Sequence, residues 1–145
     1  MILIDTNVLV HAANRESQFY DKCHDVLEQR RRSSSPWYLS WPICYEFLRV
    51  CTHPGTLAKP RTAAQAWQFL DTLLASPNAG ILVPGSRHAA ILLEVLTELP
   101  HLRGNILHDV HTAVLMREHG IREICTRDTD FHRFPFVKVI DPVAG

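Results

Sequence analysis

The sequence predicts an α/β fold in which helices cover both faces of a parallel sheet. Short apolar segments alternate along the chain with longer segments whose apolar residues recur every three or four positions, a pattern typical of alternating strands and helices. The first strand, residues 2–4, is apolar throughout, as in strands that are buried on both faces of a sheet. Asp5, Thr6 and Asn7 follow it directly, at the edge where open α/β sheets bind ligands.

The predicted elements follow one another in a regular order. Strands are predicted at residues 2–4, 37–40, 81–84, 122–126 and 137–140. Helices are predicted at residues 8–13, 16–32, 42–52, 63–75, 86–99 and 106–119. The strands are short, whereas most of the helices carry an apolar stripe at helical spacing.

Residues with known positional preferences mark several helix ends. Pro42 suits a first helical turn, and Thr62 and Ser86 suit the capping position before a helix. The His-Pro-Gly segment at residues 53–55 ends one helix. Gly120 follows another helix, at the position where a left-handed residue is favoured.

Length and composition predict one domain, residues 1–145, in the cytoplasm. The chain is 46% hydrophobic and 21% charged, with zero net charge, so it carries no overall basic signal for nucleic-acid binding. Its apolar runs are too short to cross a membrane, and Met1 leads straight into the predicted first strand, so we do not expect a secreted protein. The four cysteines lack CxxC and zinc-finger spacing, which predicts buried thiols in a reducing compartment.

Four acidic residues hold positions that this fold can bring toward one edge of the sheet. Asp5 ends the first strand, Glu46 lies early in the helix after the second strand, and Asp128 follows the fourth strand. Asp109 lies early in the helix before the fourth strand, so its position depends on the fold, and Asp130 comes two residues after Asp128. Each acid alone also suits a helix cap, a turn or an exposed helix face.

A group of carboxylates in one cleft points to metal-ion chemistry. Neighbouring carboxylates repel one another and stay ionised at neutral pH only if cations compensate them. Hard divalent cations such as Mg²⁺ and Mn²⁺ prefer oxygen ligands, and they promote displacement at phosphorus. A chain of zero net charge can therefore act on a phosphate substrate through bound cations.

Four segments, in this order, resemble those of PIN-domain ribonucleases, and most closely the VapC toxins of type II toxin–antitoxin systems. They are Ile-Asp-Thr-Asn at residues 4–7, Glu46, Leu-His-Asp-Val-His-Thr-Ala at residues 107–113, and Cys-Thr-Arg-Asp-Thr-Asp-Phe at residues 125–131. The resemblance covers nearly the whole chain, and it is specific because all four segments occur together at the expected spacing.

The resemblance implies a three-layer α/β/α PIN-like fold with a central five-stranded parallel sheet in the order 3-2-1-4-5. It implies an endoribonuclease that depends on Mg²⁺ or Mn²⁺, hydrolyses RNA phosphodiester bonds and inhibits translation as a toxin. It also implies a homodimer and inhibition by a cognate VapB-like antitoxin.

Residue by residue, the resemblance assigns the acidic catalytic and metal-binding cluster to Asp5, Glu46, Asp109 and Asp128. Asp130 is a close rival of Asp128, as a further metal ligand or as a supporting residue. The other residues implied to support Asp5 and the metal site are Thr6, Asn7 and Thr126.

The function and two groups of residues each have a second interpretation. The alternative function is a catalytically silent PIN-like module that binds RNA or a protein, with the same fold but without metal-dependent cleavage. His108 and His111 share a helix face beside Asp109 and are either ordinary polar residues or substrate contacts, since no HExxH motif is present. The three arginines at residues 30–32 either suit a helix C-terminus or, with the loop at residues 51–61, contact RNA or a partner.

Overall fold

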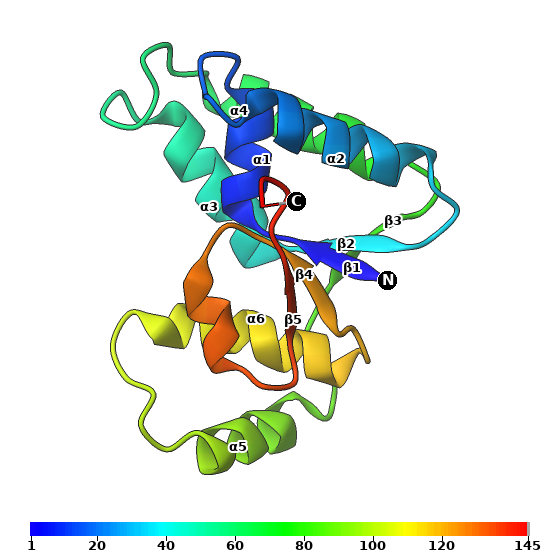
Figure 1. Ribbon diagram of the computed structural model, residues 1–145, viewed down its shortest axis with the longest axis vertical. Coiled ribbons are helices and arrows are strands. Elements are labelled where there is room, and N and C mark those ends of the chain that lie inside the picture. The colour runs from blue at the N-terminus through cyan, green and yellow to red at the C-terminus, as the bar shows by residue number, and fades with distance from the viewer. Residues whose placement is uncertain (145) are drawn as a thin grey trace.

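A computed structural model describes residues 1–144, which contain a five-stranded parallel sheet (Figure 1). Its strands are β1 (Ile2–Ile4), β2 (Trp37–Ser40), β3 (Ala79–Leu82), β4 (Glu123–Cys125) and β5 (Lys138–Ile140). They pair in the order β3-β2-β1-β4-β5, which confirms the expected order. Gly145, the last residue of the predicted domain, lies outside the described residues.

Helices cover both faces of the sheet and complete the predicted three layers. They are α1 (Thr6–Ala13), α2 (Tyr20–Arg32), α3 (Trp41–Thr52), α4 (Ala63–Leu74), α5 (His88–Glu98) and α6 (Ile106–Glu118), with a short 3₁₀ helix, η1 (Thr129–Arg133), after β4. Figure 1 shows α1 to α4 on one side of the sheet and α5 and α6 on the other. Within residues 1–144, no helix is both long and apolar enough to span a membrane.

Strand β1 lies at the centre of the hydrophobic core. Its three residues are at most 1% exposed, because β2 and β4 flank the strand and helices cover both of its faces. The pairing with β4 extends one residue further, where the N–H of Asp5 donates to the carbonyl of Cys125 (3.0 Å). The buried strand therefore fixes the position of a carboxylate at the edge of the sheet.

The second helix is shorter than the sequence pattern predicts. A helix is expected over residues 16–32, but α2 begins only at Tyr20. The Ser17 hydroxyl accepts a hydrogen bond from the N–H of Phe19 (3.1 Å) and lies 2.7 Å from Nδ1 of His11. These contacts form a turn between α1 and α2, so the predicted first turn of the helix is wrong.

The segment between β3 and α5 also departs from the prediction. Strand β3 (Ala79–Leu82) begins and ends two residues earlier than the predicted strand at residues 81–84, and α5 begins at His88 without a cap from Ser86. The carboxylate of Glu118 accepts a hydrogen bond from the N–H of Gly85 and lies 2.9 Å from Nδ1 of His88. Glu118 of α6 therefore holds this segment in a turn, and the segment forms neither strand nor helix.

The cysteines are core residues, as predicted. All four are buried and free. Burial raises the pKa of the Cys23, Cys44 and Cys51 thiols to about 11 and that of Cys125 to about 12. These thiols are protonated at neutral pH, so they pack as small apolar side chains and are poor nucleophiles.

Candidate active site

A cleft of about 930 Å³ opens at the carboxyl ends of the strands. Its walls come from the segment after β1, from α3, from α6 and from the turn after β4. The four acids that the sequence singled out all line this cleft: Asp5, Glu46, Asp109 and Asp128. Segments more than 100 residues apart in the chain thus meet at one edge of the sheet, which we call the acid cleft.

Asp5 both caps a helix and faces the acid cleft. Its Oδ1 accepts a hydrogen bond from the N–H of Thr6 (2.8 Å) at the start of α1. Loss of water around this carboxylate raises its pKa, although hydrogen bonds from Thr126, Thr6 and Asn7 oppose the rise. Asp5 can therefore cap α1 and still present its carboxylate to the acid cleft.

Asn7 and Thr126 fasten the end of β1 to the end of β4. Oδ2 of Asp5 accepts hydrogen bonds from the Thr126 hydroxyl (2.8 Å) and from Nδ2 of Asn7 (3.1 Å). Asn7 also accepts a hydrogen bond from the N–H of Arg127 (2.9 Å), and Oγ1 of Thr126 accepts one from the N–H of Asp128 (3.0 Å). We call Asn7 and Thr126 the strand clamp, because they set Asp5 and Asp128 in a fixed relation.

Thr6 holds the opposite side of the acid cleft. Its hydroxyl donates to the carbonyl of Ile43 in α3 (3.4 Å), so it joins the start of α1 to the start of α3. This contact orients the helix that carries Glu46. Thr6 contacts Asp5, as predicted, but through its backbone N–H, which donates a hydrogen bond to Oδ1 of Asp5 (2.8 Å).

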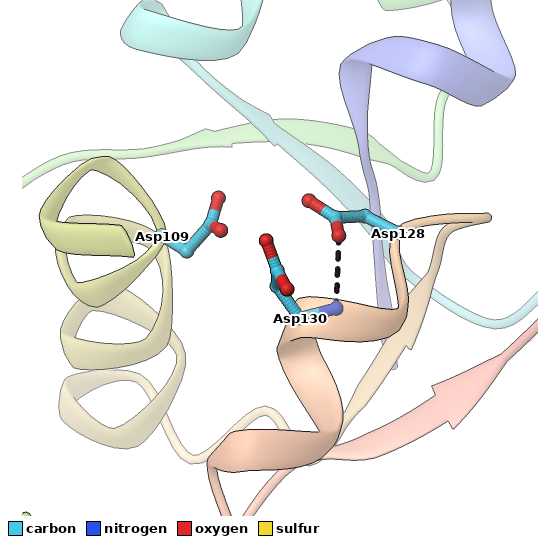
Figure 2. A group of neighbouring side chains, drawn as sticks. All are labelled: Asp109, Asp128 and Asp130. Carbon is cyan, nitrogen blue, oxygen red and sulfur yellow. Dashed lines mark hydrogen bonds between the residues drawn. The ribbon is translucent and has the colours of Figure 1, made fainter. Parts of the chain in front are cut away.

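Three acids converge most tightly: Asp109 from α6, and Asp128 and Asp130 from the turn into η1. Figure 2 shows their carboxylates pointing toward one another across the space between α6 and η1. One carboxylate oxygen of each lies within 4.8 Å of the other two. The N–H of Asp130 donates to Oδ1 of Asp128 (2.9 Å), so this turn presents both carboxylates to Asp109.

The electrostatics of this acidic triad favour a cation. Burial, and then the charges of Asp128, Asp5 and Asp130, raise the pKa of Asp109 to about 7. Every converging ligand atom of the triad is a carboxylate oxygen, which is the donor that Mg²⁺ and Mn²⁺ prefer. The donor set and its uncompensated repulsion therefore fit a hard divalent cation.

Glu46 lies in the acid cleft but is not a member of the triad. It forms a two-point ion pair with Arg49, one turn along α3, in which Nε of Arg49 donates to Oε2 of Glu46 (3.0 Å). The hydrogen bond from Arg49, together with the charges of Arg49 and His108, holds the pKa of Glu46 below its usual value, against a smaller opposing effect of burial. The Glu46 carboxylate is therefore ionised and paired with Arg49 in the acid cleft.

The two histidines beside Asp109 occupy different environments. His108 is exposed at the cleft, whereas His111 is half-buried. Nδ1 of His111 is buried without a hydrogen-bond partner among the described residues, and its ring lies 5.6 Å from that of His88. Neither histidine joins a group of three potential metal ligands within residues 1–144.

Sequence reasoning missed Arg49 in this cleft. The signal for it was a cation three residues after Glu46 on a helix, a spacing that places two side chains on one face. It also left Asp130 as a rival of Asp128, whereas the structure brings both acids to Asp109.

Comparison with known proteins finds relatives that match nearly the whole chain. The family model described as PIN domain matches residues 2–137. Ribonuclease VapC48 of Mycobacterium tuberculosis is 33% identical, over 97% of this chain and 97% of its own. Ribonuclease VapC33 of the same species is 32% identical, over 99% of each chain.

Solved structures show the same fold at lower identity. VapBC2 from Rickettsia felis, solved bound to a DNA fragment from its promoter, includes a chain that aligns with a TM-score of 0.69 and 21% identity, covering 97% of this chain and 98% of that one. FitAcB from Neisseria gonorrhoeae aligns with a TM-score of 0.69 and 20% identity, covering 98% of each chain.

Proposed function

Because the chain belongs to the PIN-domain family, we propose that it is a metal-dependent endoribonuclease and the toxin of a toxin–antitoxin pair. One observation carries the proposal: the carboxylates of Asp109, Asp128 and Asp130 converge, and two of them, Asp109 and Asp128, line the same cleft as Asp5. The relatives that match nearly the full chain are named ribonucleases, and the structural neighbours include toxin–antitoxin complexes.

We propose Mg²⁺ or Mn²⁺ as the cofactor. Asp109, Asp128 and Asp130 would hold the cation, with Asp5 as a further ligand on the side of β1. Such a cation supplies Lewis acidity, which activates water and neutralises charge on the phosphate under attack.

The residues of the acid cleft prepare this site before any substrate arrives. The strand clamp fixes Asp5 through Oδ2, and the N–H of Asp130 fixes Asp128 through Oδ1. Carboxylates held in this way lose little conformational freedom when a cation binds, which favours affinity.

The partner proposed for this chain is a VapB-like antitoxin, alongside a second copy of the chain in a homodimer. A groove of about 600 Å³ between α2 and α4 supports a partner-binding role, because Arg31, Lys59 and Arg61 line it. The two basic segments identified in the sequence therefore face one groove outside the acid cleft. Arg31 and Arg32 also pair with Glu28, which fits the structural interpretation of residues 30–32.

We further propose that residues 1–145 form one domain and that the protein acts in the cytoplasm. The four free, buried thiols support a reducing compartment. The alternative role, a catalytically silent module, gives no reason for three carboxylates to converge despite their repulsion.

Cleavage assays test the proposed activity. Transfer RNA, ribosomal RNA and single-stranded DNA would be incubated with the wild type, Asp5→Asn and Glu123→Gln, each with Mg²⁺, Mn²⁺ or EDTA. Glu123 lies at the start of β4, at the opposite edge of the sheet from Asp5. We expect metal-dependent cutting of RNA by the wild type and by Glu123→Gln, and loss of cutting in Asp5→Asn. A folded wild type that binds metal but cuts none of these substrates would favour the silent module.

A further inference from the structure

Arg49 is the one lysine or arginine among the described residues that line the acid cleft. Its side chain is 63% exposed, and it projects from α3 beside the acids. The other charged groups that line the cleft are carboxylates and histidines. A polyanion that enters this cleft therefore meets one permanent positive charge from the protein.

The ion pair between Arg49 and Glu46 is of a kind that exchanges readily. The two residues are three apart on a helix, and the Glu46 side chain is 46% exposed. Exposed pairs of this spacing contribute little to stability, because water solvates both partners well when they separate. The guanidinium of Arg49 can thus leave Glu46 for another oxyanion at small cost.

A phosphate group suits the guanidinium at least as well as a carboxylate does. Arginine binds phosphate through two parallel N–H donors, the same geometry that Arg49 uses toward Glu46. Resting on the proposed ribonuclease function, we propose that Arg49 binds a backbone phosphate of the RNA and releases Glu46 as it does so. The substrate then exchanges one ion pair for another at the wall of the acid cleft.

This exchange gives Glu46 two positions with different roles. Without RNA it neutralises Arg49. With RNA bound to Arg49, and with a cation balancing the charge of the acidic triad, its carboxylate is free to turn toward the acids of the cleft. Arg49 is therefore a substrate-binding residue that also controls when Glu46 becomes available.

RNA binding in EDTA tests the exchange without cleavage. The probe is a fluorescein-labelled 20-nucleotide single-stranded RNA of mixed sequence, followed by fluorescence anisotropy over a range of salt concentrations. The proteins are the wild type, E46Q, R49A, R49K and the double variant E46Q/R49A. The matched control is R117M, because Arg117 forms a similar two-point ion pair, with Glu98, outside the acid cleft.

The proposal predicts opposite signs for the two partners. E46Q should bind RNA more tightly by a few-fold, because Arg49 no longer has to leave a carboxylate. R49A should bind about 5- to 10-fold more weakly, with a salt slope reduced by about 0.7 for one lost phosphate contact. R49K should retain part of the affinity, and R117M should match the wild type.

The double variant separates substrate binding from simple neutralisation of Glu46. If Arg49 contacts phosphate, E46Q/R49A should bind about 5- to 10-fold more weakly than E46Q. Equal affinity of these two variants would overturn the proposal, as would an equal loss in R117M or the absence of RNA binding by the wild type. The proposed function stands or falls separately, on metal-dependent cutting of RNA by the wild type.

Discussion

Two hollows of similar size lie at opposite edges of the sheet, and they differ in how their charges are balanced. At the carboxyl ends of the strands, the acid cleft of about 930 Å³ holds carboxylates whose repulsion raises the pKa of Asp109 to about 7. At the amino ends lies a hollow of about 830 Å³, and the charged residues that line it are Arg117, Arg122, Glu123 and Lys138. We call the second one the basal hollow.

Three of the four charged side chains that line the basal hollow, those of Arg117, Glu123 and Lys138, form ion pairs within the protein. Arg117 pairs with Glu98 (2.9 Å), and its guanidinium lies 3.9 Å from the centre of the Phe136 ring. Lys138 pairs with Glu123 across β5 and β4 (3.6 Å). The two hollows are therefore similar in size, and we expect the uncompensated charge of the acid cleft to mark the functional edge.

Removal of a carboxylate should lower RNA cleavage at one edge of the sheet and not at the other, which is the largest difference that we expect. Asp128→Asn takes one charged oxygen ligand from the acidic triad, so RNA cleavage should fall roughly 100- to 1,000-fold, as when a charge-stabilising group is lost from an active site. Glu123→Gln in the basal hollow should leave cleavage unchanged. Initial rates at saturating Mn²⁺ make the comparison, and equal losses in both variants would remove the functional distinction between the edges.

Loosening the strand clamp should have the next largest effect. Thr126→Val removes the hydroxyl that donates to Asp5 and accepts from the N–H of Asp128, so both acids lose a fixed position. We expect cleavage to fall about 10- to 100-fold, as for groups that orient metal ligands. Thr97→Val, whose hydroxyl contacts only the Leu93 carbonyl on α5, is the isosteric control. Unchanged cleavage in Thr126→Val would mean that the clamp does not position the acids.

The acidic triad should also make stability depend on pH. The folded protein holds the pKa of Asp109 near 7, above its ordinary value of 3.8, so the native state binds this proton more tightly than the unfolded state does. Without metal, the free energy of unfolding should therefore fall as pH rises from about 4 to 7. Because Asp109 is partly exposed, we expect a loss of only about 1–2 kcal/mol.

Denaturant unfolding of the wild type and of Asp109→Asn in EDTA, at pH 5 and pH 8, measures this loss. The variant should lose less stability over the interval than the wild type does, and Mn²⁺ should restore the wild type at pH 8. Identical pH dependence of the two proteins would show that the carboxylates do not repel one another as the geometry indicates.

The basal hollow should respond only through stability. Arg117→Met keeps much of the apolar stem but removes the ion pair with Glu98 and the cation–π contact with Phe136. We expect a loss of about 1 kcal/mol in the free energy of unfolding, with cleavage at saturating Mn²⁺ unchanged. A large loss of cleavage with intact stability would instead give this edge a part in the activity.

The fold was largely predictable because local patterns of apolar residues determine most of its strands and helices. The apolar residues 2–4 indicated a central strand, and β1 lies between β2 and β4. Errors arose where a distant side chain decides the backbone. Glu118 holds the segment before α5, and no local pattern around Ser86 carries that information.

The candidate site was predictable in its residue types but not in its contacts. Strand ends and helix starts placed Asp5 and Asp128 at one edge, as found. The hydrogen bond between Asn7 and Thr126 spans 119 residues, so it depends on the strand order. The pairing of Glu46 with Arg49 is local, yet only the fold shows that this pair lies in the acid cleft.

A calorimetric titration with Mn²⁺ tests most directly whether the uncompensated carboxylates form a cation site. The proteins are the wild type, Asp128→Asn and Glu123→Gln, each without RNA. We expect the wild type and Glu123→Gln to bind Mn²⁺ with equal affinity, and Asp128→Asn to bind it at least about 10-fold more weakly. Equal affinity in all three proteins, or no binding by the wild type, would show that these carboxylates do not form a cation site.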